Sequence, residues 1–398
     1  MNQSSRPTIL PIRLGIVSNG DPEDARTWSG VPNAILRHIT PMVDSVVYLP
    51  AGPVSSKRRY WELYRKGLSR MLGRRALPSL DRCYLMRRTD SIAAAARRES
   101  VDAILGITVD QFLANLDLDV PIIHHSDTTF QGLEGWYPHV SRLWPASSRR
   151  GHQVTREAIH RSAHSTYPSR WAATQAIETY GARPEDTTVI PYGCNILEAP
   201  SRDSALQRDI TPDGACRLLF IGRDWNRKGG PLVLETLKLL RDRNVDATLT
   251  VVGAHPPRTD LPVETIGFLN QQVAEDRERY RSLWRDATFL FMPSRAETFG
   301  AVYAEAAANG VPSIALDIGG VGDAVVDGVY GRLLPPDADA ERCASVIVEI
   351  MDSPSEYAQI VHTSRDRYET TLNWNAWCGT TVEIIERVLS GDEKEDRK

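Results

Sequence analysis

Short apolar runs rich in β-branched residues alternate with helical patterns through the first half of the chain. Stretches of helical periodicity, such as 90–100 and 153–162, separate these runs. An alternation of this kind is typical of βαβ units, so it predicts a parallel sheet with helices on its faces. The predicted strands of this half are 13–18, 45–49, 103–106, 121–124 and 188–190.

A second alternating series follows the polar stretch 199–214, which carries two prolines and is predicted to be a linker. The fold class is therefore α/β, with two Rossmann-like parallel-sheet domains in tandem. Ligands bind at the carboxyl ends of the strands in such sheets, so we expect the two domains to face an inter-domain cleft. The predicted strands of the second half are 217–221, 247–252, 287–292, 312–316 and 331–334, followed by a helix at 377–389.

Length and composition agree with two soluble domains. A chain of 398 residues exceeds the size of one core, and its 41% apolar and 25% charged residues exclude a disordered chain. The net charge of −4 argues against nucleic acid as a partner. Five scattered cysteines without a CxxC favour a reducing compartment, and the apolar run 10–17 is too short for a signal or a membrane span. We therefore expect a cytoplasmic location.

One segment departs from this charge balance. Between Lys57 and Arg98, thirteen basic residues face only Glu62, Asp81 and Asp90. A solvated helical surface is one interpretation of this pattern. A basic face that contacts the anionic inner surface of a membrane is the other, since Trp61 and neighbouring apolar residues could supply its apolar side.

The first candidate for chemistry is the segment 221–230, which directly follows a predicted strand. Gly222 permits a sharp turn, after which Arg223 and Lys228 can converge. Two cations suit a diphosphate, and arginine can bind it through a bidentate fork. The alternative is a basic surface loop before a helix. The phosphate-binding pattern G-x-x-x-x-G-K-[ST] is absent.

The second candidate is the segment 293–312, a predicted strand end, turn and Ala-rich helix. Glu297 falls in the turn and Glu305 lies eight positions later on the helix. The backbone N–H groups of Phe299, Gly300 and Ala301 would lie at the helix N-terminus, which is suited to an anion. A carboxylate at Glu297 would bind sugar hydroxyls and one at Glu305 a ribose diol, although two glutamates at this spacing also occur by chance.

These segments together resemble glycosyltransferase family 4, retaining enzymes of GT-B architecture with an E-x7-E signature. Glu297 and Glu305 carry the signature, and the Gly-Arg…Lys-Gly loop precedes them in the family's order. The resemblance covers nearly the whole chain and is more specific in its second half. Further matching elements are 167–170 (Tyr-Pro-Ser-Arg), 191–193 (Pro-Tyr-Gly), Gly319-Gly320 and Trp374.

The resemblance implies a role for each matching residue. Arg223 and Lys228 would bind the donor diphosphate, Glu297 the transferred sugar and Glu305 the ribose. The stretch 266–268 would lie against the base. The expected donor-contacting residues are Gly30, Gly222, Arg223, Lys228, Ile266, Phe268, Glu297, Thr298, Phe299, Gly300 and Glu305.

The chain departs from the family pattern in three places. Its first loop has only Gly30 where the family often has paired glycines, and Gly322-Asp323 stands where a glutamate often follows Gly319-Gly320. The family's sugar-contacting histidine follows the strand that is here 121–124. Either Asp127 or His125 takes that place, and Asp127 joins Glu297, Arg223 and Lys228 as an expected catalytic residue.

By resemblance, the domains are 1–200 on the acceptor side and 214–372 for the donor nucleotide. A crossover helix at 373–390 returns toward the first domain, and 391–398 forms a disordered tail. The expected reaction moves a hexose from a UDP- or GDP-sugar to a hydroxyl of a glycan or glycolipid, in cell-envelope synthesis, with retention and without a metal or bound cofactor. The alternatives are a sugar-nucleotide epimerase or hydrolase, and a non-catalytic sugar-nucleotide-binding subunit.

The basic segment gives a direct prediction. If it contacts anionic lipid, reversing the charge of Arg58, Arg59 and Arg65 should lower co-sedimentation with phosphatidylserine vesicles, since each basic residue contributes about 1 kcal/mol near such a surface. Neutral phosphatidylcholine vesicles serve as the control. Unchanged binding to the anionic vesicles would leave the solvated helical surface as the correct interpretation.

Overall fold

The chain divides into two compact units, as the computed structural model describes for residues 9–53, 67, 69, 73–207 and 214–391. The first unit comprises Met1–Ile190 together with Trp377–Lys398, and the second comprises Pro191–Ala376. Most of the basic segment's first half, including Arg58, Arg59 and Arg65, and the tail 392–398 lie outside the described residues.

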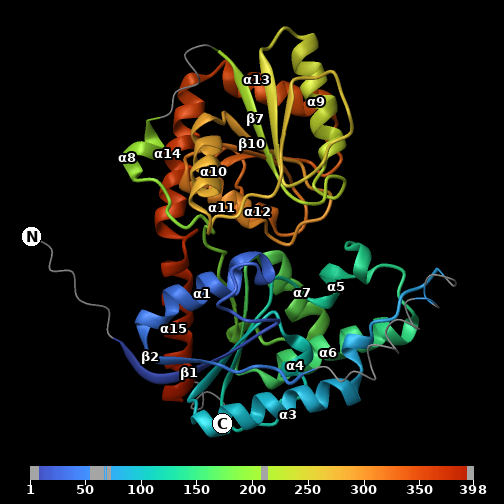
Figure 1. The fold of residues 1–398 in the computed structure, drawn as a ribbon, viewed down its shortest axis with the longest axis vertical. Coiled ribbons are helices and arrows are strands. Elements are labelled where there is room, and N and C mark those ends of the chain that lie inside the picture. The colour runs from blue at the N-terminus through green and yellow to red at the C-terminus, as the bar shows by residue number, and fades with distance from the viewer. Residues whose placement is uncertain (1–8, 54–66, 68, 70–72, 208–213, 392–398) are drawn as a thin grey trace, which may run out of the picture. The chain divides into compact units, whose positions relative to one another are not determined.

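The first unit is built on a six-stranded sheet in which every neighbouring pair is parallel (Figure 1). Its strand order is β2-β1-β3-β4-β5-β6, so the order reverses between β1 and β3. The strands are β1 (Leu10–Ser18), β2 (Val43–Tyr48), β3 (Ala103–Ile107), β4 (Ile122–His125), β5 (His164–Tyr167) and β6 (Thr187–Val189).

Helices cover this sheet and close its core. Buried side chains of α3, α4 and α6, such as Ile92, Phe112 and Val154, join one apolar cluster with the sheet. The helices of this unit are α1 (Val31–Ile39), α3 (Arg82–Glu99), α4 (Asp110–Leu113), α5 (Phe130–Leu133), α6 (Pro145–Arg161) and α7 (Arg170–Tyr180).

The last helix, α15 (Trp374–Ser390), begins in the second unit and packs into the first from Trp377 onward. The buried Trp377 ring meets His125 edge-on, with centroids 4.9 Å apart. Farther along the helix, Arg387 Nη2 donates to His164 Nδ1 at 3.3 Å. The predicted return of a C-terminal helix to the first domain is therefore confirmed.

The second unit also has a six-stranded parallel sheet, in the order β9-β8-β7-β10-β11-β12. This is the strand order 3-2-1-4-5-6 of dinucleotide-binding folds, with its switch point between β7 and β10. The strands are β7 (Cys216–Ile221), β8 (Ala247–Val252), β9 (Val263–Ile266), β10 (Phe289–Met292), β11 (Ser313–Leu316) and β12 (Gly331–Leu334).

Helices α9 and α13 pack together in this unit, and so do α11 and α14. The helices are α8 (Arg202–Leu206), α9 (Gly230–Asp242), α10 (Ala274–Asp286), α11 (Ala301–Ala308), α12 (Val321–Ala324), α13 (Ala340–Met351) and α14 (Pro354–Thr370). The two parallel sheets confirm the predicted fold class. Helix α8 falls within the stretch that was predicted to be an irregular linker.

Two strands were missed because their sequences are polar. Strand β5 reads His-Ser-Thr-Tyr, yet all four residues are buried. The side chains of three of them bond to neighbouring strands: His164 Nε2 lies 2.8 Å from Thr188 Oγ1, Ser165 Oγ lies 3.2 Å from His124 Nδ1, and Thr166 Oγ1 lies 2.9 Å from His125 Nδ1. Strand β9 is the exposed edge of its sheet and has only one buried residue.

The tight turn before α9 yields a prediction about stability. Gly229 has φ +83°, and a Cβ there would lie 1.9 Å from the carbonyl oxygen of Pro293. Gly229→Ala should therefore destabilise the second unit by about 1–3 kcal/mol beyond backbone strain alone, as overpacking does. The change in melting temperature by circular dichroism measures it.

Gly328→Ala is the matched control. Gly328 has φ +70°, and a Cβ added there would meet no atom within 4 Å, so the substitution adds only the left-handed backbone cost of about 1–2 kcal/mol. Equal losses of melting temperature in the two variants would show that the contact with Pro293 relaxes easily.

Candidate active site

The loops that follow β7 and β10 meet at the switch point of the second sheet. Lys228, in the first loop, donates from Nζ to Oε2 of Glu297, in the second. Arg227 reinforces the pair: its Nη1 lies 4.0 Å from the same Oε2 and donates to the carbonyl oxygen of Ala296 at 2.8 Å. The two sequence candidates for chemistry therefore form one site.

Their backbones touch as well as their side chains. Arg295 N donates to the Arg227 carbonyl oxygen at 2.7 Å. Gly229 passes so close to Pro293 that a side chain would collide with the carbonyl. The position of Lys228 relative to Glu297 is thus set by rigid backbone rather than by two flexible side chains.

Two backbone N–H groups also form hydrogen bonds to Glu297. Its Oε1 accepts from Thr298 N at 3.2 Å, and its backbone oxygen accepts from Gly320 N at 3.3 Å. Gly320 belongs to the Gly319-Gly320 turn after β11, so three strand ends contribute to the site. Glu297 is only 6% exposed, which gives the carboxylate a fixed orientation.

Helix α11 begins beside Glu297. Gly300 is its N-cap, with φ +85°, and no side chain among the described residues caps it. The Phe299 ring before it is buried and lies edge-on to Tyr192, with centroids 5.6 Å apart. The first amides of α11 are therefore placed next to a carboxylate and two cations, an arrangement suited to an anionic ligand beside a hydroxyl-bearing one.

Arg223 stands apart from this cluster. Its guanidinium carbon lies 4.8 Å from the centre of the Phe268 ring, a cation–π contact between two exposed side chains. Phe268 is 60% exposed, whereas Ile266 is only 8% exposed and completes β9. In the stretch 266–268, which was predicted to lie against the nucleotide base, the Phe268 side chain is accessible to a ligand and the Ile266 side chain is not.

Glu305 lies on the second turn of α11 and is 7% exposed. Burial raises the pKa of its carboxyl group to about 7. The Tyr280 hydroxyl, from α10, donates to Oε2, and this hydrogen bond lowers the same pKa. A carboxyl group with this environment changes charge near neutral pH.

The first unit contributes the candidates Gly30, His125 and Asp127. Gly30 is the N-cap of α1, with φ +84°, at the end of the loop that follows β1. His125 is fully buried between Thr166 and Trp377, and burial lowers its pKa to about 3. Asp127, two residues beyond the end of β4, is partly exposed. The neutral, enclosed His125 packs against α15 through Trp377.

Two residues of the site escaped the sequence analysis. Arg227 stands next to Lys228 in a basic run, and this adjacency was the only signal for it. Tyr280 precedes Glu305 by 25 positions on a different helix, so no local pattern could connect them. The structure brings together Lys228, Glu297, Thr298 and Gly300, while Gly30 and Asp127 belong to the other unit.

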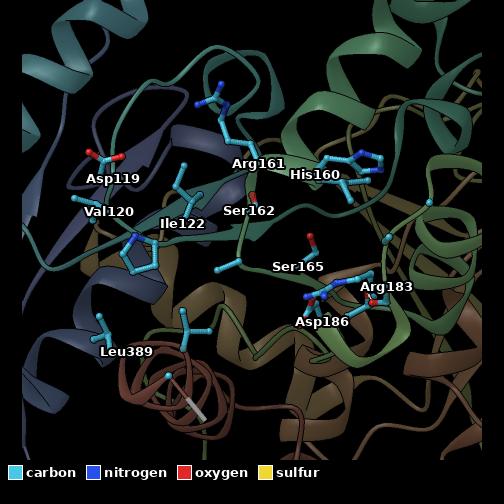
Figure 2. Close-up of a pocket in the computed structure, with 18 residues that line it drawn as sticks. Asp119, Val120, Ile122, His160, Arg161, Ser162, Ser165, Arg183, Asp186 and Leu389 are labelled. Carbon is cyan, nitrogen blue, oxygen red and sulfur yellow. Dashed lines mark hydrogen bonds and ion pairs between the residues drawn. The ribbon is translucent and has the colours of Figure 1, made fainter. Parts of the chain in front are cut away.

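A hollow of about 770 Å³ lies in the first unit (Figure 2). It is lined at the amino-terminal ends of the strands, by Pro121 and Ile122 of the β4 start and Thr187 of the β6 start. His125 and Asp127 follow the opposite end of β4. Of its two arginines, Arg183 forms an ion pair with Asp186, and Arg161 donates to the carbonyl oxygen of Leu116.

Comparison with known proteins agrees with this geometry. Residues 215–353 match the family described as glycosyl transferases group 1. The chain is 28% identical to the D-inositol 3-phosphate glycosyltransferase of Kineococcus radiotolerans over 297 residues, which cover 68% of this chain and 67% of that protein. It is 26% identical to glycogen synthase of Mycobacterium tuberculosis over 69% of this chain and 65% of the relative. The chain thus spans about two thirds of these relatives' length.

Solved structures show the same fold. Sucrose-phosphate synthase from Thermosynechococcus elongatus aligns with a TM-score of 0.66 at 18% identity, covering 96% of this chain and all of that one. HepE of Anabaena, solved in complex with UDP-glucose, aligns with a TM-score of 0.61 at 17% identity, covering 93% and 99% of the two chains. With the E-x7-E signature placed at the switch point, residues 215–353 are similar to the glycosyl transferases group 1 family, and the chain shares the fold of these solved structures.

Proposed function

We propose that the protein transfers a hexose from a nucleotide sugar to a hydroxyl acceptor with retention of configuration. The observation that carries this proposal is the junction of Lys228 and Glu297 at the start of α11. A cation beside helix amides suits the diphosphate, and a fixed carboxylate beside them suits the hydroxyls of the sugar.

In the proposed reaction, the bond between sugar C1 and the diphosphate oxygen breaks while a bond between C1 and the acceptor oxygen forms on the same face. The acceptor proton passes to the leaving phosphate oxygen, so neither a hydrolase-type carboxylate pair nor a redox step is needed. Catalysis then consists of positioning and of stabilising the charge that develops on the phosphate. Arg223, Lys228 and the N–H groups at Gly300 supply that stabilisation, while Glu297 orients the sugar.

The donor is proposed to be a UDP- or GDP-hexose. HepE of Anabaena, one of the similar structures, was solved with UDP-glucose, which favours a pyrimidine nucleotide as the first candidate. Phe268 offers an exposed aromatic face for the base, and Arg223 above it can turn toward a diphosphate. Glu305 is proposed to bind the ribose.

The acceptor is proposed to be a glycan or glycolipid of the cell envelope. Asp127 is the proposed acceptor-side contact of the first unit, because His125 is enclosed. The proposed location is cytoplasmic and close to the membrane, and the basic residues between Lys57 and Arg98 support this proposal. No helix among the described residues is long and apolar enough to cross a membrane.

The first test concerns the ion pair. Lys228→Ala and Glu297→Ala should each lower transfer by about 100-fold or more, since removing one group that stabilises a transition state costs that much. Turnover of the sugar nucleotide that gives the largest thermal shift is the readout. Lys238→Ala, which removes an exposed α9 lysine paired with Asp242, is the control. Near wild-type transfer by both site variants would refute the assignment.

The same assay without acceptor separates the alternative activities. An epimerase or hydrolase would consume the donor alone at the full rate, whereas a transferase needs the acceptor. Tight donor binding without turnover on any acceptor would indicate a binding subunit.

The second test concerns metal ions. We expect transfer to be unaffected by a chelator, because the proposed site neutralises the diphosphate with cations of the chain. The chain has two D-x-D triplets, at 117–119 and 337–339. In the second, the Asp339 side chain caps α13 by accepting from Arg342 N at 2.9 Å. Activity measured in EDTA, with and without added manganese, gives the answer. A loss in EDTA that manganese restores would overturn the expectation.

A further inference from the structure

Tyr280 and Glu305 form a polar contact inside the apolar interior of the second unit. Tyr280 lies on α10 and is 6% exposed, while Glu305 lies on α11 and is 7% exposed. The tyrosine hydroxyl donates to Oε2 of the glutamate. Among the described residues, no other hydrogen bond to this carboxylate is found, so Oε1 has its acceptor capacity left.

The direction of this hydrogen bond is fixed by the chemistry of both groups. Burial and the nearby Glu305 carboxylate raise the pKa of the Tyr280 hydroxyl well above its usual range. Tyr280 therefore stays protonated and always donates. For the ionised glutamate, which has acceptors only, this leaves Oε2 occupied and Oε1 open.

The surroundings hold Tyr280 itself in place. The Trp284 ring, one turn farther along α10, lies edge-on to it with centroids 6.1 Å apart. Trp284 is fully buried, which leaves the tyrosine little freedom. A buried and immobilised donor can select one rotamer of the long glutamate side chain, which otherwise has three rotatable bonds.

We propose that Tyr280 is the positioning residue of the nucleotide site: it holds Glu305 so that Oε1 accepts from a ribose hydroxyl of the donor. This inference rests on the proposed function, because it takes the ligand of Glu305 to be a nucleotide ribose. It goes beyond that function by assigning a role to a residue outside the E-x7-E segment. Tyr280 has no contact with the ligand and acts through the carboxylate.

The experiment compares nucleotides that differ only in the ribose. The affinities of UDP, 2′-deoxy-UDP and 3′-deoxy-UDP, or of the GDP series if wild-type protein prefers guanine, are measured by titration calorimetry. Wild-type protein should favour the ribose form by about tenfold or more, the usual effect of a hydrogen bond to a charged group. Tyr280→Phe should reduce this ratio to near one while leaving the affinity for the deoxy forms unchanged.

Tyr357→Phe is the matched control. Its hydroxyl is equally buried in the same unit and donates to the Thr288 carbonyl oxygen at 3.2 Å. This variant loses a buried hydrogen bond without touching Glu305, so it should keep the wild-type ratio. If Tyr280→Phe does not fold, Tyr280→Met, which also lacks the donor, replaces it.

The pH dependence of the ribose preference is a further readout, because a loss of packing around residue 280 would not shift it. The Tyr280 hydrogen bond lowers the pKa of Glu305, so its removal raises that pKa. Any ribose preference that Tyr280→Phe retains should therefore be lost, on acidification, at a higher pH than the preference of wild-type protein. The Cys194 thiol, whose pKa is raised by burial and by Glu305, is a titrating neighbour of this carboxyl group, and Cys194→Ala separates its contribution.

A double variant tests whether Tyr280 acts through Glu305. In the Glu305→Gln background, Tyr280→Phe should change the ribose preference by less than about twofold, because the two residues act as one unit. An equal loss of affinity for ribose and deoxyribose forms in Tyr280→Phe, or a wild-type ratio, would overturn the positioning role alone. Wild-type protein that binds neither UDP nor GDP would instead overturn the proposed function.

Discussion

The close approach of two loops at the switch point of the second sheet is the constraint on which the rest of the site depends. Gly229 and Pro293 bring the backbones after β7 and β10 into contact, and Lys228 and Glu297 form an ion pair next to that contact. Parallel strands with this order leave a crevice between their first and fourth members. The strand order of the sheet therefore determines where the site lies, and the side chains of the two loops determine its chemistry.

This constraint also explains why so much of the second unit could be predicted from sequence. Strands β8 and β12 were predicted with their observed bounds: β8 is rich in Thr and Val, and β12 ends in the apolar pair Leu333 and Leu334. The E-x7-E segment was identified because its turn, glycine and helix are local features. Arg227 and Tyr280 were missed because their importance comes from contacts across the fold. Sequence patterns identify groups that lie close together in the chain, and Tyr280, the partner of Glu305, lies 25 positions away from it.

The first unit illustrates the opposite case. Its sheet was predicted in outline, but β5 has no apolar signature, and the role of His125 could not be read from its position after β4. In the structure, contacts between β4, β5 and the last helix explain both the polar sequence of β5 and the burial of His125. The side chains of β4 and β5 pair with each other, and Trp377 of the returning helix closes over His125. Histidines here serve the packing of the sheet, and Asp127 remains the proposed ligand contact.

The polar character of β5 has a consequence for the chain before it is folded. Strand β5 is paired on both sides only once β6, which follows it in the chain, has been made. Apolar segments in that situation pair with other chains and aggregate. A strand reading His-Ser-Thr-Tyr is instead well hydrated until β4 and β6 supply the partners that its side chains need. The polar sequence of β5 thus lowers the tendency of this strand to pair with other chains before the sheet is complete.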